Sequence, residues 1–257
     1  MIDREQPIAV FDSGVGGISV LKEMVKLMPH ENFLYYGDSL NAPYGTKSTE
    51  EVRRLTIEHT ENFLDRGAKA VAIACNTATS AAVRVLRQMY PELPLVGIEP
   101  ALKPAVLHKD QAKVLVLATP MTIREEKFQH LLNQYKDQGT IYPLACPGLM
   151  EYVERGEMDS PKLYEFLQEL LEDYIGKVDS VVLGCTHYPF TKRSIQRILG
   201  DEVEIFDGGY GTAREMKRRI QEAGLLNEDP DYTGKITFEN SELSQKKLDL
   251  CWKLLNY

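Results

Sequence analysis

Short apolar runs rich in β-branched residues alternate along this chain with longer stretches that show helical periodicity. The runs lie at residues 8–13, 32–39, 70–77, 93–100, 113–120, 140–146, 180–188 and 204–209. Most of them are continuously apolar and end in a polar or small residue, which is typical of parallel strands buried on both faces. Between them, a helical stretch such as 49–67 ends at a glycine, a common helix stop signal. The alternation predicts βαβ units and therefore an α/β protein with doubly wound parallel sheets.

The order of these runs indicates two similar halves. IAVFDSGVGG and then VAIACNTATS in the first half correspond to VLVLATPMTI and then VVLGCTHYPF in the second. Each half thus has a first strand with a polar end and a later strand that ends at a cysteine. A proline-containing segment at 97–105 and a glycine-rich one near 206–212 predict the crossings between the halves. We expect a first, discontinuous domain of residues 1–97 plus 210–257 and a second domain of residues 98–209, with the active site between them.

The C-terminal tail contains turn residues, a possible short strand at 235–239 and an amphipathic final helix. An amphipathic helix buries its apolar face against a neighbouring element. We expect this helix to pack against the first domain.

Composition limits the partners that this protein can have. The 257 residues include 30 Lys and Arg against 38 Asp and Glu, a net charge of −8. Phosphates are bound by clustered Lys and Arg, so this balance argues against nucleic-acid and anionic-membrane partners. The start of the chain has no signal-like apolar stretch, and no run approaches the roughly 20 apolar residues of a membrane span. The 4 cysteines form no CxxC pair, which favours reduced thiols and a cytoplasmic location.

Cys75 ends one predicted strand, at the edge where parallel sheets bind their ligands. Asn76 and Thr77 follow it just before a predicted helix. Donors at a helix N-terminus lower a thiol pKa, whereas burial raises it. A reactive thiol and a buried structural cysteine therefore both fit this segment taken alone.

Cys185 ends the corresponding strand of the second half, and His187 follows two residues later. On a strict strand both side chains point to one face, where they could act as a thiol and its proton partner. A zinc site, a Cys–His hydrolase and a core histidine are the alternatives. Zinc sites usually show paired ligand spacings, and a hydrolase needs an oxyanion hole but no second cysteine.

Two further segments contain candidate ligand-binding residues. In DSGVGG, Asp12 and Ser13 end a strand before a glycine-rich turn, which suits either an anion cradle or a tight turn capped by Asp12. Ser19 occupies the third glycine position of a dinucleotide fingerprint, so that motif is incomplete. In the polar loop 35–48, Pro43 and Gly45 flank Tyr44, which suits either a binding loop or an ordinary turn. The polar residues collect at strand ends, which favours one ligand site; they are Asp12, Cys75, Thr119 and Cys185.

Together, DSGVGG, DxxNAPYGTKS, CNTATSAA, IEPA and GCTHYPF resemble the glutamate racemases of the aspartate/glutamate racemase superfamily. The resemblance implies two domains of similar fold, a homodimer, and interconversion of L- and D-glutamate that supplies D-glutamate for peptidoglycan. It implies neither a cofactor nor a metal. One thiolate would remove the Cα proton while the opposite thiol donates one to the other face.

The resemblance also assigns roles to individual residues. Cys75 would act on D-glutamate with the help of Asp12, and Cys185 on L-glutamate with the help of His187. Glu154, in YVERG, would support that histidine. The implied substrate-binding residues are Asp12, Ser13, Pro43, Tyr44, Gly45, Asn76, Thr77, Thr119, Thr122, Thr186 and His187.

Other functions remain open at this point. A racemase for aspartate or another amino acid would share the two-cysteine plan. A catalytically silent amino-acid-binding protein is a further alternative, because ATPMTIRE at 118–125 replaces the glycine-containing turn of the family. A zinc-dependent enzyme is the third.

Overall fold

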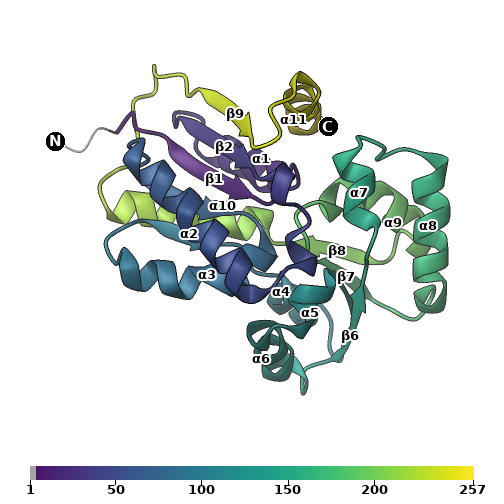
Figure 1. The fold of residues 1–257 in the computed structure, drawn as a ribbon. Coiled ribbons are helices and arrows are strands. Elements are labelled where there is room, and N and C mark those ends of the chain that lie inside the picture. The colour runs from purple at the N-terminus through teal and green to yellow at the C-terminus, as the bar shows by residue number, and fades with distance from the viewer. Residues whose placement is uncertain (1–3) are drawn as a thin grey trace. The chain divides into compact units, whose positions relative to one another are not determined.

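The computed structural model describes residues 4–257, apart from the side chain of Lys127. The chain forms two compact units (Figure 1). Unit 1 consists of Met1–Glu99 and Gly209–Tyr257, and unit 2 of Pro100–Gly208. Unit 1 is therefore built from both ends of the chain.

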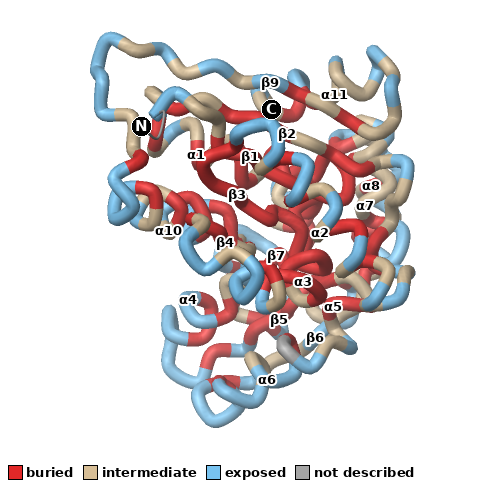
Figure 2. The backbone as a smooth tube through the Cα atoms, turned by 60° about the vertical axis from the view of Figure 1, so that its left-hand side comes forward, coloured by how far each residue is buried: buried red, intermediate tan, exposed pale blue. Residues whose placement is uncertain are grey.

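Unit 1 contains a parallel sheet with the strand order β4-β3-β1-β2-β9. Its strands are β1 (Ile8–Asp12), β2 (Phe33–Gly37), β3 (Ala70–Ile73), β4 (Leu95–Gly97) and β9 (Ile236–Asn240). Its helices are α1 (Ile18–Leu27), α2 (Thr49–Asp65), α3 (Asn76–Met89), α10 (Gly209–Glu222) and α11 (Gln245–Asn256), with short 3-10 turns η1 (Ser39–Asn41) and η2 (Tyr44–Thr46). Helix α2 packs on α3, and α1 packs on α10 and α11. Every residue of β1 and β3 is buried (Figure 2), as expected for central strands covered on both faces.

Unit 2 contains a parallel sheet with the strand order β6-β5-β7-β8. Its strands are β5 (Lys113–Ala118), β6 (Thr140–Ala145), β7 (Ser180–Leu183) and β8 (Glu204–Asp207). Its helices are α4 (Leu102–Leu107), α5 (Pro120–Arg124), α6 (Glu126–Tyr135), α7 (Leu149–Glu154), α8 (Pro161–Leu171) and α9 (Lys192–Leu199), with 3-10 turns η3 (Glu172–Tyr174) and η4 (Tyr188–Thr191).

Alternation along β5 divides the core of unit 2 into two layers. Leu115 and Leu117 pack with residues of α7, α8 and α9, whereas Val114 and Val116 pack with residues of α4 and α6. Successive side chains of a strand point to opposite faces, so β5 contributes to both layers. The sheet is thus covered by helices on each side.

The two units share one topology, which confirms the predicted fold of two similar parallel-sheet halves. In each unit the second strand in chain order lies on one side of the first strand, and the third strand lies on the other. The point at which the strand order changes direction is called a topological switch point. In such sheets the ligand crevice lies at the carboxyl ends of the two strands beside that point. In unit 1 this point lies between β1 and β3, and in unit 2 between β5 and β7.

Local predictions were mostly confirmed. Helix α2 ends at Asp65, and Gly67 adopts a φ of 82°, which suits a glycine after a helix end. The predicted strand in the tail is β9, and the final helix α11 packs on α1 and β9 of unit 1. Two expected strand ends were wrong: β3 ends at Ile73 and β7 at Leu183, so Cys75, Cys185 and His187 follow their strands and do not lie on them.

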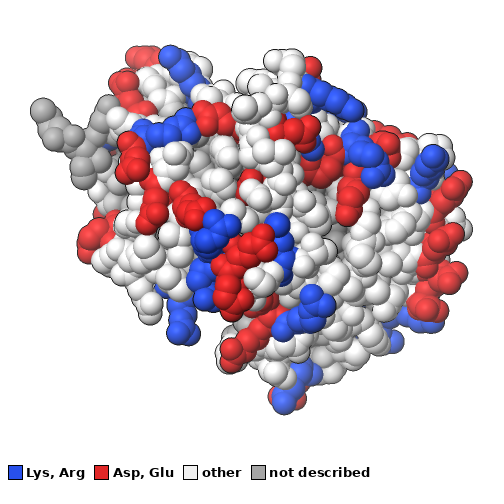
Figure 3. Space-filling model, viewed as in Figure 1, with Lys and Arg blue, Asp and Glu red and all other residues white. Residues whose placement is uncertain are grey.

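Charged side chains of both signs are interspersed on the face drawn in Figure 3. Several charges are paired within one helix, such as Arg54 with Glu58 on α2 and Arg218 with Glu222 on α10. Exposed pairs of this kind contribute little to stability individually. No helix in the described part of the chain has the length and apolarity needed to cross a membrane.

Candidate active site

Cys75 is the residue on which helix α3 begins. It directly follows the turn after β3, has an extended backbone and is 5% exposed. The free backbone N–H groups at the start of α3 give this end of the helix a partial positive charge, which favours a thiolate. The Sγ atom lies 3.5 Å from the Oγ atom of Ser13, at hydrogen-bonding distance. Cys75 and Ser13 therefore meet at the switch point of unit 1, where the sequence placed both.

Asp12 ends β1 beside them and is completely buried. The backbone N–H of Gly17 donates a hydrogen bond of 2.8 Å to Oδ2 of Asp12, so the carboxylate also holds the turn into α1. A side chain at Gly17 would have its Cβ 2.7 Å from Cβ of Asp12 and 2.9 Å from Cβ of Ala74. The glycine thus allows α1 to start directly against Asp12 and the residue before Cys75. The expected capped turn is present, and it orients the Asp12 carboxylate.

Asn76 and Thr77, in the first turn of α3, are 5% and 2% exposed. Within the described residues, neither side-chain amide atom of Asn76 has a hydrogen-bond partner. A buried amide without partners is costly, and such groups commonly mark a site that a ligand or water completes. Asn76 is therefore a strong candidate for a ligand contact in unit 1.

Tyr44 lies in the loop after β2 and is 1% exposed. Its hydroxyl donates a 2.7 Å hydrogen bond to Oδ2 of Asp38. Burial, this hydrogen bond and the nearby charges of Asp38, Cys75 and Asp12 raise the pKa of Tyr44 well above its ordinary value. The predicted loop residues Pro43, Tyr44 and Gly45 thus belong to the same end of the unit 1 sheet as Cys75.

In unit 2, Cys185 and His187 are brought together as predicted, although by a turn. The Sγ atom of Cys185 lies 3.7 Å from Nδ1 of His187. Nε2 of His187 lies 2.8 Å from Oε1 of Glu154, at the end of α7. The carboxylate accepts the Nε2 proton and so turns Nδ1 toward the thiol, an arrangement that fixes the orientation of the ring.

The same contacts control the charge of His187, which is 1% exposed. Burial alone would lower the pKa of the imidazole. The hydrogen bonds to Cys185 and Glu154, and the negative charges of both partners, more than offset it and raise the pKa of His187 well above its ordinary value. A protonated imidazole beside Cys185 stabilises the thiolate and can also return a proton to it.

Hydroxyl groups surround the strand ends of unit 2. Thr119 follows β5 and caps α5, and its Oγ1 lies 2.9 Å from Oγ1 of Thr122. Thr122 is 1% exposed, and Thr186, next to Cys185, is 3% exposed. Because β5 and β7 are neighbours, with Leu117 opposite Leu183, all three threonines belong to the switch point of unit 2.

Each unit therefore gathers the candidate residues that the sequence assigned to it. Those of unit 1 are Asp12, Ser13, Pro43, Tyr44, Gly45, Cys75, Asn76 and Thr77, and those of unit 2 are Thr119, Thr122, Glu154, Cys185, Thr186 and His187. Each group contains one buried thiol with a polar partner that can exchange a proton. Among the described residues, no His, Cys, Asp or Glu side chains form a group of three that could hold a metal ion.

Comparison with known proteins agrees with this arrangement. A family model described as Asp/Glu/Hydantoin racemase matches residues 11–216. A glutamate racemase from Clostridium botulinum (strain Okra / Type B1) is 48% identical over 254 residues, which are 98% of this chain and 98% of the relative. This chain belongs to the Asp/Glu/Hydantoin racemase family. Membership of the family makes it a racemase, and therefore an isomerase, and confirms the prediction drawn from its five motifs.

Solved structures of racemases have the same fold over nearly the whole chain. Glutamate racemase isoform RacE1 from Bacillus anthracis matches with a TM-score of 0.87 and 30% identity, covering 99% of this chain and 96% of that one. A glutamate racemase from Francisella tularensis in complex with D-glutamate matches with a TM-score of 0.83 and 26% identity, covering 99% and 95%.

The racemase contains a third buried thiol that sequence reasoning did not distinguish. Cys146 is 2% exposed, and Tyr188 donates a 3.3 Å hydrogen bond to its carbonyl oxygen. Burial and the neighbouring charge of Cys185 raise the pKa of Cys146 to about 12. Cys146 therefore stays protonated at neutral pH and cannot serve as a thiolate base.

Sequence reasoning gave no role to two residues of the racemase that support Tyr44. Asp38, immediately after β2, accepts a hydrogen bond from the Tyr44 hydroxyl and contacts His59 on α2. Asp38 carried a signal, because it begins the DxxNAPYGTKS motif and lies at the end of a predicted strand, as Asp12 does. His59 carried none, since nothing in its helix indicates a partner on the sheet.

Proposed function

We propose that this racemase interconverts L- and D-glutamate without a cofactor and supplies D-glutamate for peptidoglycan. The substrate is supported by the name of the Clostridium botulinum relative and by the D-glutamate bound to the Francisella tularensis neighbour. The mechanism is supported above all by one observation: two buried thiols follow equivalent strands of two similar units, each beside its own proton partner.

In the proposed mechanism both thiols act on one Cα atom. A thiolate takes the Cα proton, so that the Cα–H bond breaks, an S–H bond forms and a carbanion remains. The second thiol then gives its proton to the opposite face of Cα and becomes a thiolate. The enantiomer is released, and the two sulfurs have exchanged protonation states, ready for the reverse direction. No external acid, base or oxidant is consumed.

Cys185 is proposed to act on L-glutamate and Cys75 on D-glutamate. His187, oriented by Glu154, would stabilise the Cys185 thiolate and supply or remove its proton. Asp12 is an anion and cannot favour a thiolate at Cys75, so its proposed part is to accept or orient a proton. The start of α3 supplies the positive potential that favours the Cys75 thiolate.

The carbanion also needs stabilisation, because a Cα–H bond is a weak acid. Hydrogen bonds from buried donors to the substrate carboxylate can supply part of it, since they are strong in a site shielded from water. The unpartnered amide of Asn76 and the hydroxyls of Ser13, Thr77, Thr122 and Thr186 are the proposed donors. A local set of donors is necessary here, because the net charge of −8 does not attract an anionic substrate.

Three further expectations accompany this proposal. The protein is proposed to work in the cytoplasm, as a homodimer, and without nucleic-acid or membrane partners. Residues 1–97 plus 210–257 and residues 98–209 are proposed to be its two domains, and these limits lie within two residues of those of the compact units.

Deuterium exchange tests the function. In D2O, each enantiomer of glutamate should exchange its Cα proton and approach a 1:1 mixture, followed by circular dichroism and NMR. Cys75→Ala and Cys185→Ala should each stop racemisation, because each leaves one face of Cα without an acid or base. Cys251→Ala is the matched control: this thiol is buried in α11, far along the chain from both motifs, and its loss should leave racemisation intact.

Other outcomes would contradict the proposal. Exchange with neither enantiomer, together with calorimetric binding of glutamate, would identify a silent binding protein. Faster turnover of aspartate or another amino acid in a substrate panel would replace glutamate as the substrate. Racemisation that survives either cysteine substitution would refute the two-thiol mechanism.

A further inference from the structure

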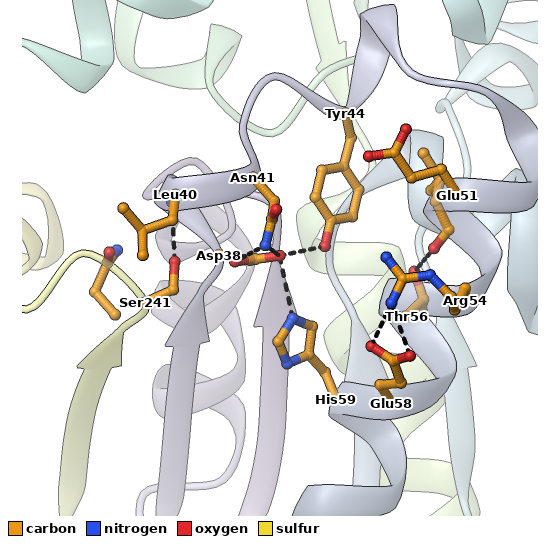
Figure 4. Close-up of polar contacts among 12 residues, drawn as sticks. Asp38, Leu40, Asn41, Tyr44, Glu51, Arg54, Thr56, Glu58, His59 and Ser241 are labelled. Carbon is orange, nitrogen blue, oxygen red and sulfur yellow. Dashed lines mark hydrogen bonds and ion pairs between the residues drawn. The ribbon is translucent and has the colours of Figure 1, made fainter.

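A buried carboxylate connects the binding loop of unit 1 to helix α2. Asp38, immediately after β2, has no exposed side-chain surface. It accepts hydrogen bonds from Nδ2 of Asn41 to both of its oxygens at 3.0 Å, from the Tyr44 hydroxyl at 2.7 Å and from Nε2 of His59 at 3.1 Å (Figure 4). Burial by itself would raise the pKa of Asp38. The hydrogen bonds from His59, Tyr44, Asn41 and Ser241 outweigh burial and lower the pKa to about 2. Asp38 is therefore an anion at neutral pH that gathers these donors.

Two of those donors, Asn41 and Tyr44, belong to the loop itself. A phenol has a single proton, and Tyr44 donates it to Asp38 and not to a ligand. The raised pKa of Tyr44 keeps that proton in place. Tyr44 can therefore offer a substrate its ring, the acceptor lone pairs of its oxygen and the backbone of its loop, in the position that Asp38 imposes.

The third donor, His59, holds Asp38 from the side of α2. Its ring packs against two aromatic rings, with centroids 5.1 Å from Phe11 and 4.8 Å from Tyr36, and its side chain is 20% exposed. Figure 4 shows the imidazole below the carboxylate and the loop residues on the other side of it. His59 thus fixes the carboxylate, and the carboxylate fixes the loop.

The end of β9 holds the first part of the same loop. The backbone N–H of Leu40 donates to Oγ of Ser241 at 2.9 Å, and Nδ2 of Asn240 donates to Oγ of Ser39 at 2.9 Å. In the segment from Asn41 to Tyr44, which follows, the side chains of Asn41 and Tyr44 both donate to the Asp38 carboxylate. That segment carries Pro43 and Tyr44 of the predicted substrate-binding set.

We infer that Asp38 and His59 are positioning residues of the racemase: they hold Tyr44 and its loop in the conformation that receives glutamate. The inference rests on the proposed function, because the loop is assigned to the substrate there. A loop held in its binding conformation lowers the Kd, since less of the protein must be ordered when the ligand binds. Neither residue takes part in the proposed proton transfers, so those steps should be affected much less than binding.

Substitutions at His59 test this inference. His59→Phe keeps an aromatic ring against Phe11 and Tyr36 but removes the donor to Asp38. Loss of one hydrogen bond to a buried charged group corresponds to roughly tenfold or more in an equilibrium constant. The KM and the calorimetric Kd for glutamate should rise by about that factor, while kcat changes by less than about threefold. His59→Gln restores an N–H at a similar reach and should lie closer to the wild type in KM than His59→Phe does.

A matched control separates positioning from general destabilisation. His30→Phe makes the same change at a histidine that lies before β2, whereas Asp38 follows it. There Nδ1 of His30 forms a hydrogen bond with the carbonyl oxygen of Tyr232. It should change the Tm without raising KM. A His59→Phe protein with an unchanged KM, with a lowered kcat alone, or with no difference from His59→Gln would overturn the inference.

Tyr44→Phe provides a test that does not depend on His59 variants folding. It removes only the hydroxyl, and its effect on KM should be much smaller in an Asp38→Asn background than in the wild type, because the two residues act through one hydrogen bond. Additive effects would overturn the inference. A wild-type protein that fails to racemise or bind glutamate would instead refute the proposed function, so the two failures can be told apart.

Discussion

Cys75 and Cys185 occupy equivalent positions but have different proton partners. Cys75 has Ser13 within 3.5 Å and follows the strand that neighbours Asp12. Cys185 has an imidazole whose raised pKa reflects its contacts with the thiol and with Glu154. In the proposed mechanism, the two faces of the substrate therefore meet chemically distinct acid–base groups, although the units share a fold.

Replacing His187 should reveal this asymmetry. The two enantiomers are equally stable, so His187→Asn must lower kcat/KM equally in both directions, by about 10²–10⁴-fold if the imidazole is a general acid–base. The primary isotope effects measured with L-glutamate and with D-glutamate need not be equal. Because only the Cys185 step is slowed, the primary isotope effect should rise for L-glutamate deuterated at Cα and fall for D-glutamate deuterated there. Equal changes in both isotope effects would show that His187 does not act on one face alone.

Residues at the ends of predicted strands could be found from the sequence. Of their partners on helices, Glu154 was implied by the resemblance, whereas His59 was not. Asp12, Cys75 and Cys185 each end a continuous apolar run, and parallel strands present such ends at one edge of a sheet. His59 lies 21 residues from Asp38, within a helix whose pattern describes only its own apolar face. That contact depends on how α2 packs on the sheet, which no local pattern specifies.

At the scale of elements, the turn from β1 into α1 is shaped by one glycine. Gly17→Ala would place a Cβ within 3 Å of both Asp12 and Ala74. The packed neighbours are short, buried side chains that cannot move aside, so we expect a loss of about 1–3 kcal/mol in the free energy of unfolding. Racemisation should also fall, because Asp12 is displaced.

Gly211→Ala is the control for that prediction. Gly211 lies in the first turn of α10, and its added Cβ would meet nothing within 4 Å. Alanine favours the helix over glycine, so this variant should be unchanged or more stable by about 0.4–1 kcal/mol. Urea denaturation of both variants measures the contrast, and a Gly17→Ala protein as stable and active as Gly211→Ala would refute the packing argument.

The order of the elements was predictable because most strands are continuous apolar runs. The residue at which a strand ends was harder to predict. The run SVVLGCTHY suggested a strand through His187, but β7 ends at Leu183. Gly184 still donates to the carbonyl oxygen of Leu117 at 2.7 Å, and a Cβ there would lie 2.8 Å from that oxygen. The close approach lets the chain turn immediately afterwards, and the turn itself brings His187 back to Cys185.

At the scale of the molecule, unit 1 must join segments from both ends of the chain. A buried ion pair lies where they meet: Nζ of Lys69 is 2.5 Å from Oε2 of Glu31, and both side chains are 1% exposed. Lys69 also donates to the carbonyl oxygens of Arg4 and Leu225, while the N–H of Asn227 donates to Glu31. The pair thus connects the N-terminal segment, the entrance to β3 and the chain after α10.

Lys69→Met should therefore destabilise unit 1 strongly. It leaves the Glu31 carboxylate buried without its cation, which typically costs about 3–5 kcal/mol. Adding Glu31→Leu should recover part of that loss, because the uncompensated charge is then removed as well. Arg54→Met is the control: it breaks a pair whose side chains are 59% and 53% exposed, and exposed pairs contribute about 0–1 kcal/mol. Chemical denaturation of the three variants measures the differences. A Lys69→Met protein no less stable than Arg54→Met would mean that the two ends of unit 1 are joined by packing alone.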